Sequence, residues 1–600
     1  MSIKRIHVMD TSFRDGFQSV FGARVLTPDF IPALEAAVEA GITHFEAAGG
    51  ARFQSLYFYC NEDAFASMDL FRKTVGPEIN LQSLARGINV VGLDSQPADI
   101  IELHAKLFKK HGMTTIRNFD ALNDPNNLKF SGECIKKYGL KHEISISLMD
   151  LPPGCQGAHD VAFYKKVLES ILAQEIPFDS ICFKDASGTS HPRKVFETIK
   201  IAREILPKDT FIRFHTHESA GVSVACYMAA LEAGADGIDL AMEPVSGGTS
   251  QPDILTMIHA LKNTQWDLGL DAQKILRAEE VFKDCMKDYF FPPEALVVSP
   301  LIPFSPMPGG ALTANTQMMR DSNMLDKFPQ VIRAMEEVVR KGGFGTSVTP
   351  VSQFYFQQAL NNVMFGPWKK IAEGYGKMVL GYYGKTPVAP DQDIVDISSE
   401  QLKLPPTQES PMERDNKNPQ KGVPSAISKL KEHQIKETEE NIFIAATCQD
   451  KGIAFLKGQA KLQIRKETKK ETQADNEIPS TYSVLIDQTP YEVVLGKDKI
   501  TVNGKSYQAS IQEKQAQKPL NTPLSESKTK PIEAPMSGQL VNIFRKNGDT
   551  VKVGEVILVM EAMKMEIEIK SPYQGIISEI NLQVGDSISG GQKLLWIKTE

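Results

Sequence analysis

The sequence lacks any apolar run long enough to cross a membrane. A membrane-spanning helix needs roughly 18 or more consecutive apolar residues, and the 600 residues contain no such run. The N-terminal segment, MSIKRIHVMD, also lacks the long apolar stretch and the small-residue cleavage site of a secretory signal peptide. These absences predict a cytoplasmic protein.

Cysteine pairs and an excess of positive charge are also missing. The seven cysteines are scattered without a CxxC pair, which is typical of reduced thiols in a reducing compartment. The 67 Lys and Arg against 74 Asp and Glu give a net charge of −7. A chain with this balance has no general attraction to a phosphate backbone, so we expect no nucleic-acid partner.

The first 265 residues alternate short apolar strands with amphipathic helices. Eight strand candidates begin at Ile6, His44, Leu81, Thr115, Ile144, Ile181, Ile212 and Gly237. This alternation indicates a parallel sheet of the α/β class, and eight units in about 250 residues match a closed (β/α)8 barrel, or TIM barrel. Polar residues follow nearly every strand, including the first and the last. That feature favours the closed barrel over a doubly wound open sheet.

Five segments follow the barrel. Residues 266–385 combine long helical patterns with Pro/Gly-rich turns and predict a helical extension that covers one end of the barrel. Residues 386–435 are rich in Pro, Lys, Glu, Gln and Ser and predict a flexible linker. Residues 436–514 predict an apolar helix followed by a small β-meander, and residues 515–530 predict a second linker. Residues 531–600 form the last expected domain.

This last domain contains an internal repeat. Five residues of one copy recur 37 positions later in the other: Pro535, Gly538, Gly548, Asp549 and Gly554. Two copies of one β-unit, neither able to bury its apolar face alone, predict a small all-β domain, a flattened barrel with a pseudo-two-fold axis. The repeat breaks at EAMKM, where the copies join, so Lys564 is expected at an exposed hairpin tip.

Charged residues follow several of the predicted barrel strands. Asp15 comes after the first strand and Lys184 after the sixth, while His215 and His217 lie at the end of the seventh. These positions face the active-site end of a (β/α)8 barrel. Two histidines at i and i+2 of an extended chain project to the same side and suit one metal ion. The spacing alone leaves two interpretations open, a metal site or two packed or solvated histidines.

Sequence motifs identify the chain as a member of the biotin-dependent carboxyltransferases. The segments DTSFRDGFQS, ARG, FDALND, FKDASG, HTHESAG and VSGGTSQPD resemble the carboxyltransferase domain of pyruvate carboxylases and of oxaloacetate decarboxylase alpha subunits. This resemblance covers roughly residues 3 to 460. From APMSG through EAMKM to VGD, the tail resembles the biotinyl domain of biotin-dependent enzymes. Lipoyl domains share that fold but usually present a different local sequence.

The resemblance implies a role for each matched residue. A divalent metal, zinc or manganese, would be held by Asp15, His215, His217 and Lys184, the last after carboxylation of its amine. The residues that would bind a 2-oxo acid are Arg14, Gln18 and Arg86. Thr349 would pass a proton between substrate and biotin, and a biotin protein ligase would attach biotin to Lys564. A Lys184–Asp185 ion pair is the alternative interpretation of the lysine.

Four positions depart from the family pattern. Relatives often carry histidine in place of Phe17, tyrosine in place of Leu93 and tryptophan in place of Ala48. Gln353 stands where many relatives have lysine, although decarboxylase-type members also carry glutamine there. The expected metal ligands are intact, whereas these substitutions are expected at the rim of the pocket. They leave the identity of the 2-oxo acid open.

The implied function is transfer of CO2 between carboxybiotin on Lys564 and pyruvate or oxaloacetate. Nothing in the sequence resembles an ATP-using biotin carboxylase, so we expect a separate biotin carboxylase subunit, as for the B subunit of two-subunit pyruvate carboxylases. The alternatives are an alpha subunit of a sodium-pumping membrane decarboxylase and a transcarboxylase or 2-oxoglutarate carboxylase component. Metal-dependent aldolases and acyl-CoA lyases share the barrel but lack a biotinyl tail. The resemblance also implies a homo-oligomer.

Overall fold

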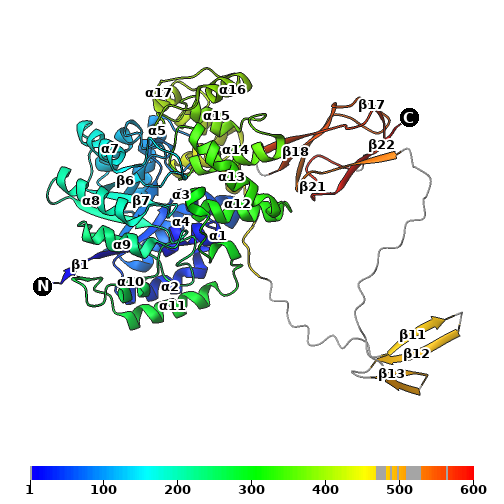
Figure 1. Ribbon diagram of the computed structural model, residues 1–600, viewed down its shortest axis with the longest axis horizontal. Coiled ribbons are helices and arrows are strands. Elements are labelled where there is room, and N and C mark those ends of the chain that lie inside the picture. The colour runs from blue at the N-terminus through cyan, green and yellow to red at the C-terminus, as the bar shows by residue number, and fades with distance from the viewer. Residues whose placement is uncertain are drawn as a thin grey trace. The chain divides into compact units, whose positions relative to one another are not determined.

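The computed structural model divides the chain into two compact units, Met1–Arg465 and Lys466–Glu600 (Figure 1). The structure describes residues 3–307, 309–467, 481–486, 489–495, 499–503, 505–508, 529–562, 565–580 and 582–599. Among the helices within these ranges, none is both long enough and apolar enough to cross a membrane.

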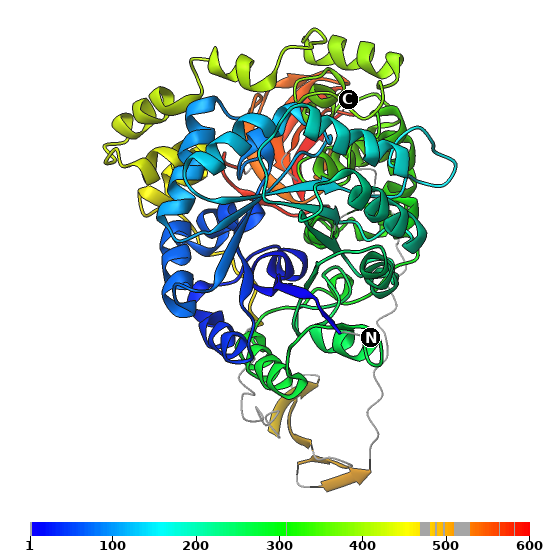
Figure 2. The same ribbon diagram turned by 90° about the vertical axis from the view of Figure 1, so that its left-hand side faces the viewer.

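Eight parallel strands close into a barrel in the first unit, as the sequence predicts. They are β2 (His7–Asp10), β3 (His44–Gly49), β4 (Asn80–Ala85), β5 (Thr115–Phe119), β6 (Lys141–Ser147), β7 (Ser180–Asp185), β8 (Phe211–Thr216) and β9 (Gly237–Leu240). Figure 2 shows these strands surrounded by helices. The helices that connect and cover them are α2 (Thr27–Glu39), α4 (Ala64–Val75), α5 (Ala98–Lys110), α6 (Asn126–Lys137), α7 (Val161–Ala173), α8 (Pro192–Ile205), α9 (Ser223–Glu232) and α10 (Ile254–Ala260).

The strands are buried because the barrel packs apolar side chains on both of their faces. In β7, for example, Ile181, Cys182 and Phe183 are all buried. The same strand ends in Lys184 and Asp185. These residues lie at the carboxyl-terminal end of the barrel strands, where polar residues gather.

The barrel interior also contains buried ion pairs. Arg117 donates from Nε to Glu143 at 2.6 Å and from Nη1 to Asp239 at 2.6 Å. Arg213 Nη1 lies 3.2 Å from the second oxygen of Asp239. Each charge is paired, which is the condition under which charges are tolerated in a protein interior.

The helices that the sequence predicts after the barrel are present. They are α11 (Ala272–Met286), α12 (Gly309–Asp321), α13 (Phe328–Lys341), α14 (Val351–Phe365) and α15 (Glu373–Val379). Phe282 of α11 packs on Phe13 with ring centroids 5.2 Å apart. Thr313 of α12 donates its hydroxyl hydrogen to the Ser19 carbonyl at 2.5 Å, so α12 lies against α1 (Phe17–Phe21), the short helix that follows the first barrel strand.

The prediction of a flexible linker at residues 386–435 is wrong. This segment forms α16 (Gln392–Leu402), α17 (Pro411–Asn416) and α18 (Gly422–Glu432). Its few apolar residues are placed so that helices can bury them: Ile394 in α16, and Ala426 and Leu430 in α18, are at most 2% exposed. The polar composition therefore belongs to the outer faces of packed helices, not to an unfolded segment.

The helix expected near residue 436 also belongs to the first unit. It is α19 (Glu439–Leu456), and its Phe443 packs edge-on against Phe53 of the barrel layer, with centroids 5.6 Å apart. The predicted grouping of this helix with the β-meander is therefore wrong, because α19 packs on the barrel and the meander lies in the second unit.

The predicted meander is a four-stranded antiparallel sheet. Its strands are β11 (Thr481–Ile486), β12 (Thr489–Leu495), β13 (Lys499–Val502) and β14 (Lys505–Gln508), paired in chain order. The second predicted linker, residues 515–530, lies outside the described residues as far as residue 528.

The last domain has the pseudo-two-fold architecture that the repeat predicts. The first copy supplies β15 (Thr529–Glu533), β16 (Gly538–Ile543), β17 (Thr550–Val551) and β18 (Val556–Ala562). The second supplies β19 (Met565–Lys570), β20 (Gly575–Ile580), β21 (Ser587–Ile588) and β22 (Lys593–Lys598). One sheet has the order β15-β22-β20-β17 and the other β19-β18-β16-β21, so each sheet combines strands of both copies.

Candidate active site and carrier lysine

A tight turn after β2 positions the first two charged residues of the site. The Asp10 carboxylate accepts hydrogen bonds from the Ser12 backbone N–H at 2.9 Å and from the Ser12 hydroxyl at 2.5 Å. The helical turn of residues Ser12–Gly16 follows, in which Arg14 and Asp15 are buried. A Cβ atom at Gly16 would lie 2.7 Å from Val245 Cγ2, so a larger residue here would force the Val245 side chain to move.

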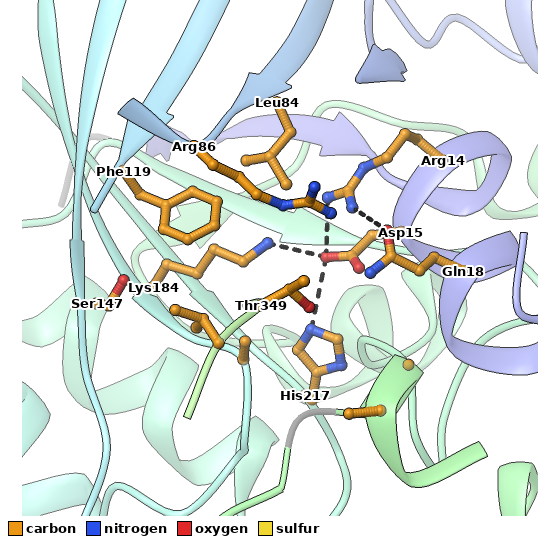
Figure 3. Close-up of a pocket in the computed structure, with 14 residues that line it drawn as sticks. Arg14, Asp15, Gln18, Leu84, Arg86, Phe119, Ser147, Lys184, His217 and Thr349 are labelled. Atoms are coloured by element: carbon orange, nitrogen blue, oxygen red, sulfur yellow. Dashed lines mark hydrogen bonds and ion pairs between the residues drawn. The ribbon is translucent and has the colours of Figure 1, made fainter. Parts of the chain in front are cut away.

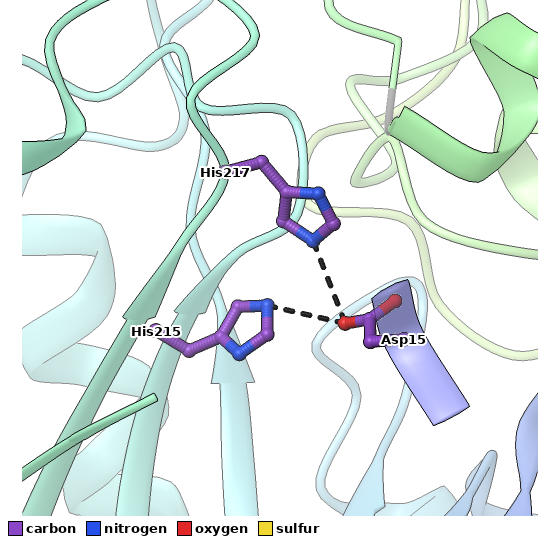
Figure 4. A group of neighbouring side chains, drawn as sticks. All are labelled: Asp15, His215 and His217. Carbon is purple, nitrogen blue, oxygen red and sulfur yellow. Dashed lines mark ion pairs between the residues drawn. The ribbon is translucent and has the colours of Figure 1, made fainter. Parts of the chain in front are cut away.

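Asp15, His215 and His217 come together at one point (Figure 4). Asp15 Oδ2 lies 3.3 Å from His215 Nε2 and 3.5 Å from His217 Nε2, and all three candidate ligand atoms lie within 4.8 Å of one another. Carboxylate oxygen and imidazole nitrogen are ligands that suit zinc and other divalent ions. The donor set therefore fits a divalent cation.

Hydrogen bonds at the far side of each ring turn the two imidazoles toward that point. His215 Nδ1 lies 2.8 Å from Asp239 Oδ2, and His217 Nδ1 lies 2.7 Å from the Thr249 carbonyl oxygen. Both partners accept hydrogen bonds, so each Nδ1 carries the proton and each Nε2 presents a lone pair. Burial, together with the charge of Lys184, lowers the pKa of His215, which keeps this imidazole neutral and able to bind a metal.

Lys184 Nζ donates to Asp15 Oδ2 at 2.9 Å. The Lys184–Asp185 ion pair, the alternative from sequence, is not formed, because the Asp185 carboxylate accepts hydrogen bonds from Ser187, Gly188 and the backbone of Ser190. Burial alone would raise the pKa of Asp15, but Arg14 and Lys184 outweigh it and hold the pKa well below its usual range. Asp15 is therefore ionised.

Seven of the eight residues that the resemblance singles out in the first unit line one pocket, whose empty space, including the part open to solvent, is about 480 Å³ (Figure 3). They are Arg14, Asp15, Gln18, Arg86, Lys184, His217 and Thr349. The eighth, His215, joins the pocket through its contact with Asp15. Thr349 lies two residues before α14, so the helical extension completes a pocket that begins in the barrel.

The two arginines of the pocket differ in how their charges are balanced. Arg14 Nη2 donates to Glu46 at 2.6 Å and lies 3.1 Å from Asp15, while its Nη1 donates to Gln18 at 3.1 Å. Arg86 Nη1 instead donates to the carbonyl oxygens of residues 91 and 92 at 2.6 and 2.9 Å. In the part of the chain that the structure describes, no carboxylate forms an ion pair with Arg86.

The environment of Arg86 suits an anionic ligand. Burial, assisted by the nearby charge of Arg14, lowers the pKa of Arg86 to about 9, so the side chain remains cationic at neutral pH. A guanidinium that is buried, charged and without a carboxylate partner favours a ligand that carries a carboxylate.

None of the four departures from the family pattern lines the pocket. Phe17 is fully buried among Phe13, Phe30 and Phe282 of the core. Leu93 is 38% exposed, and its carbonyl accepts a hydrogen bond from Asn89. The apolar wall of the pocket is formed by other residues, which the sequence reasoning did not single out: Leu84, Phe119, Ala311 and Val348.

Sequence reasoning also missed the residues that hold the site from behind. Glu46 pairs with Arg14, and Asp239 pairs with His215. Each is a charged residue inside an otherwise apolar strand, in HFEAAG and GIDL. A charge in a strand that must be buried is the signal that could have found them, since it requires a partner.

The lysine that the sequence predicts as the biotin carrier falls in a gap between two described strands. β18 ends at Ala562 and β19 begins at Met565, and these two residues pair in antiparallel register. The prediction for Lys564 falls at residues 563–564, outside the described residues. The strands on either side are those of the hairpin that joins the two copies of the repeat.

Family models match the chain in three places. The model described as HMGL-like matches residues 132–282, the conserved carboxylase domain matches residues 302–495, and the biotin-requiring enzyme model matches residues 530–597. Together with the closed barrel and its pocket, these matches define a biotin-dependent carboxyltransferase joined to a biotinyl domain.

Known proteins with the same arrangement give the particular family. The chain is 31% identical over 570 residues to the B subunit of pyruvate carboxylase from Methanocaldococcus jannaschii, covering 93% of this chain and 94% of that protein. It is 27% identical to the 2-oxoglutarate carboxylase large subunit of Hydrogenobacter thermophilus, covering 94% and 91% of the two chains. The chain belongs to the family of pyruvate carboxylase B subunits.

A solved structure supports the fold. The carboxyl transferase domain of Rhizobium etli pyruvate carboxylase, determined with pyruvate and biocytin, matches with a TM-score of 0.69 at 22% identity. The match covers 85% of this chain and 89% of that one.

Proposed function

We propose that this chain is the carboxyltransferase and biotin-carrier component of a two-subunit pyruvate carboxylase. It would move CO2 between biotin on Lys564 and pyruvate, forming oxaloacetate. The observation that carries this proposal is the convergence of Arg14, Arg86, Lys184 and Thr349 on one pocket beside the Asp15–His215–His217 group. The name of the Methanocaldococcus relative agrees with it.

The proposed metal site uses Asp15, His215, His217 and Lys184. Zinc and manganese are the ions that we expect there, and a bound ion would polarise the substrate carbonyl and stabilise negative charge on its oxygen. Lys184 Nζ already lies 2.9 Å from Asp15 Oδ2. Carboxylation of the lysine amine would replace a positive group with an anionic one, and the side chain would then suit a cation.

The charges of the pocket suit the carboxylate of a 2-oxo acid. The Arg14 charge is engaged by Glu46 and Asp15, which leaves Arg86 without a carboxylate partner among the described residues. One guanidinium without a carboxylate partner matches the carboxylate beside the keto group, which pyruvate and oxaloacetate share. Leu84, Phe119 and Val348 provide an apolar surface for the methyl group.

Thr349 is the proposed proton carrier. Biotin would carry the transferred CO2 on a ureido nitrogen. Once that CO2 has left, the Thr349 hydroxyl accepts a proton from the pyruvate methyl carbon and gives its own proton to the ureido nitrogen. Arg14, Gln18 and Arg86 hold the substrate carboxylate meanwhile, and the methyl carbon bonds to CO2. The reverse sequence decarboxylates oxaloacetate.

The proposed partners follow from the same assignment. A separate ATP-using biotin carboxylase would load biotin with CO2, and a biotin protein ligase would attach biotin to Lys564. We expect both partners in the cytoplasm and a homo-oligomer of this chain. The alternative, an oxaloacetate decarboxylase alpha subunit, requires integral membrane partners instead.

The test combines capture of partners with an assay of the isolated chain. Affinity capture of the full chain from its native cell should recover a biotin carboxylase. The purified chain should decarboxylate oxaloacetate when free biotin is supplied, and Asp15→Asn should abolish this activity. Recovery of an integral membrane protein would favour the decarboxylase, and full activity of Asp15→Asn would refute the site.

A further inference from the structure

Gln251 lies at the metal-binding group, on the segment between β9 and α10. Its side chain is fully buried. The amide nitrogen Nε2 lies 3.0 Å from His217 Nε2, 3.3 Å from His215 Nε2 and 3.3 Å from Asp15 Oδ2. The end of the Gln251 side chain therefore faces the same point as the three candidate ligands.

These distances match the spacing between neighbouring ligands of a single cation. Nitrogen and oxygen ligands lie about 2.0–2.2 Å from zinc, so neighbouring ligands of a tetrahedral or octahedral ion lie roughly 2.8–3.6 Å apart. Asp15 Oδ2 is 3.3 Å from His215 Nε2 and 3.5 Å from His217 Nε2, within the same range. The terminal amide of Gln251 thus occupies a further ligand position.

The neighbours of Gln251 let its amide present either the nitrogen or the oxygen to that point. Thr11 Oγ1 lies 2.7 Å from Gln251 Oε1 and 2.8 Å from the Leu240 carbonyl oxygen. A hydroxyl group both donates and accepts. With Nε2 toward the ligands, Thr11 donates to the amide oxygen. With the amide turned over, Thr11 accepts from Nε2 and donates to Leu240.

The Ser250 hydroxyl, 3.1 Å from Gln251 Oε1, accommodates both orientations in the same way. The amide can therefore turn over without leaving a buried hydrogen-bonding group unsatisfied. Such an exchange would otherwise be costly, because an unpaired buried donor or acceptor loses its full hydration.

We propose that Gln251 is a further ligand of the divalent cation and presents its side-chain oxygen to it. Thr11 holds the amide in that orientation. Without the cation, the amide N–H groups donate toward the lone pairs of Asp15 and the two histidines. A neutral oxygen adds a ligand without adding negative charge, so the cation would retain its ability to polarise a substrate carbonyl. The inference rests on the cation site of the proposed function.

Metal binding by the full chain tests this proposal without an assay of activity. Co²⁺ alone serves as the probe, titrated into metal-free protein and followed by its visible absorption, which reports the ligand set. Gln251→Leu should weaken Co²⁺ binding on the order of 10- to 100-fold, by analogy with residues that support metal ligands, and should alter the absorption. Gln251→Glu, which retains an oxygen, should bind Co²⁺ at least as tightly as the unsubstituted chain.

Two other variants serve as controls. Gln358→Leu removes a buried glutamine of α14 that bonds to Asn362 and Ala372, and should leave Co²⁺ binding unchanged. Thr11→Val retains Gln251 but removes the hydroxyl that supports the turned amide, and should weaken binding by a smaller factor.

The proposal is overturned if Gln251→Leu matches the unsubstituted chain in both affinity and absorption. If Gln251→Leu does not fold, unchanged affinity and absorption in Thr11→Val overturn it, and weaker binding in that variant supports it. Normal Co²⁺ binding by a chain without carboxyltransferase activity would contradict the proposed function but not the assignment of Gln251.

Discussion

Asp239 accepts a hydrogen bond from Nδ1 of His215 at 2.8 Å, at the centre of the barrel. The same carboxylate oxygen lies 2.6 Å from Arg117 Nη1. Burial would raise the pKa of Asp239, but Arg117 and the hydrogen bond from His215 hold it well below its usual range. A permanently charged carboxylate thus links the metal-binding group to the ion pairs of the interior.

Asp239→Asn should weaken metal binding about 10- to 100-fold, because it weakens the hydrogen bond that orients His215. It should also destabilise the fold by roughly 3–5 kcal/mol, since Arg117 loses a buried partner. Glu143→Gln is the matched control, because Glu143 pairs with the same two arginines, Arg117 and Arg213, but has no contact with His215. Metal titration and urea unfolding separate the two effects, and equal losses of metal affinity in both variants would contradict the role given to Asp239.

Arg86→Ala should raise the KM for pyruvate and leave metal content unchanged. Hydrogen bonds to charged groups contribute about 1.5–3 kcal/mol, which corresponds to roughly 10- to 150-fold in binding. Arg86→Lys keeps the charge but loses the planar fork of the guanidinium. Its KM for pyruvate should therefore lie between that of the unsubstituted chain and that of Arg86→Ala. Steady-state kinetics with pyruvate measure the effect, and an unchanged KM in Arg86→Ala would show that the carboxylate binds elsewhere.

Thr349→Ala should lower kcat by about 10²- to 10⁴-fold, the usual contribution of a positioned proton carrier. Thr349→Ser retains the hydroxyl and should recover most of the rate. Both variants should keep full metal content and full biotin attachment. If Thr349→Ala and Thr349→Ser have the same kcat, the Thr349 hydroxyl does not carry the proton.

Lys564→Arg should abolish recognition of the chain by avidin, because biotin is attached through the lysine amine. Lys570→Arg alters an exposed lysine in β19 of the same domain and should leave avidin binding intact. Intact-mass measurement of both variants gives an independent readout. Avidin binding by the Lys564→Arg protein would show that another group carries the cofactor.

Glu279→Gln should stabilise the protein at alkaline pH. Burial, reinforced by the charge of Asp253, raises the pKa of Glu279 in α11 from 4.5 to about 9. Between these values the folded protein holds a proton that the unfolded chain has released, so stability falls as pH rises through this window. The variant lacks this loss, and its Tm should exceed that of the unsubstituted chain by a few degrees at pH 9. The gain should shrink toward pH 5, and an equal gain at both pH values would contradict the assignment.

The barrel and most of the pocket could be predicted from the sequence because both follow from local patterns. Apolar strands such as ICFKD must be buried on two faces, and the residues that follow them face one end of the closed barrel. The HxH pair, Lys184 and Asp15 therefore converge without further information. Thr349 could be placed in the pocket only through the resemblance, since it precedes a helix well beyond the last barrel strand.

The helices between residues 386 and 435 could not be predicted, because their few apolar residues depend on distant partners. Ala426 and Leu430 are buried in a cluster with Ile442 and Ala445 of α19, and a reading of composition within one segment does not detect such a contact. Gln251 was missed for the same reason. Its contacts with Thr11 and Asp15 span more than 200 positions, and no periodic pattern marks them.

The interleaved strands of the biotinyl domain constrain when it can form. Each sheet takes two strands from residues before the central hairpin and two from residues after it. When translation has reached only Ala562, both sheets still lack the strands that the second copy supplies. The paired strands β18 and β19 therefore gain their folded support only after β22 has been synthesised, so attachment of biotin at the proposed site would be a late event in the life of the polypeptide.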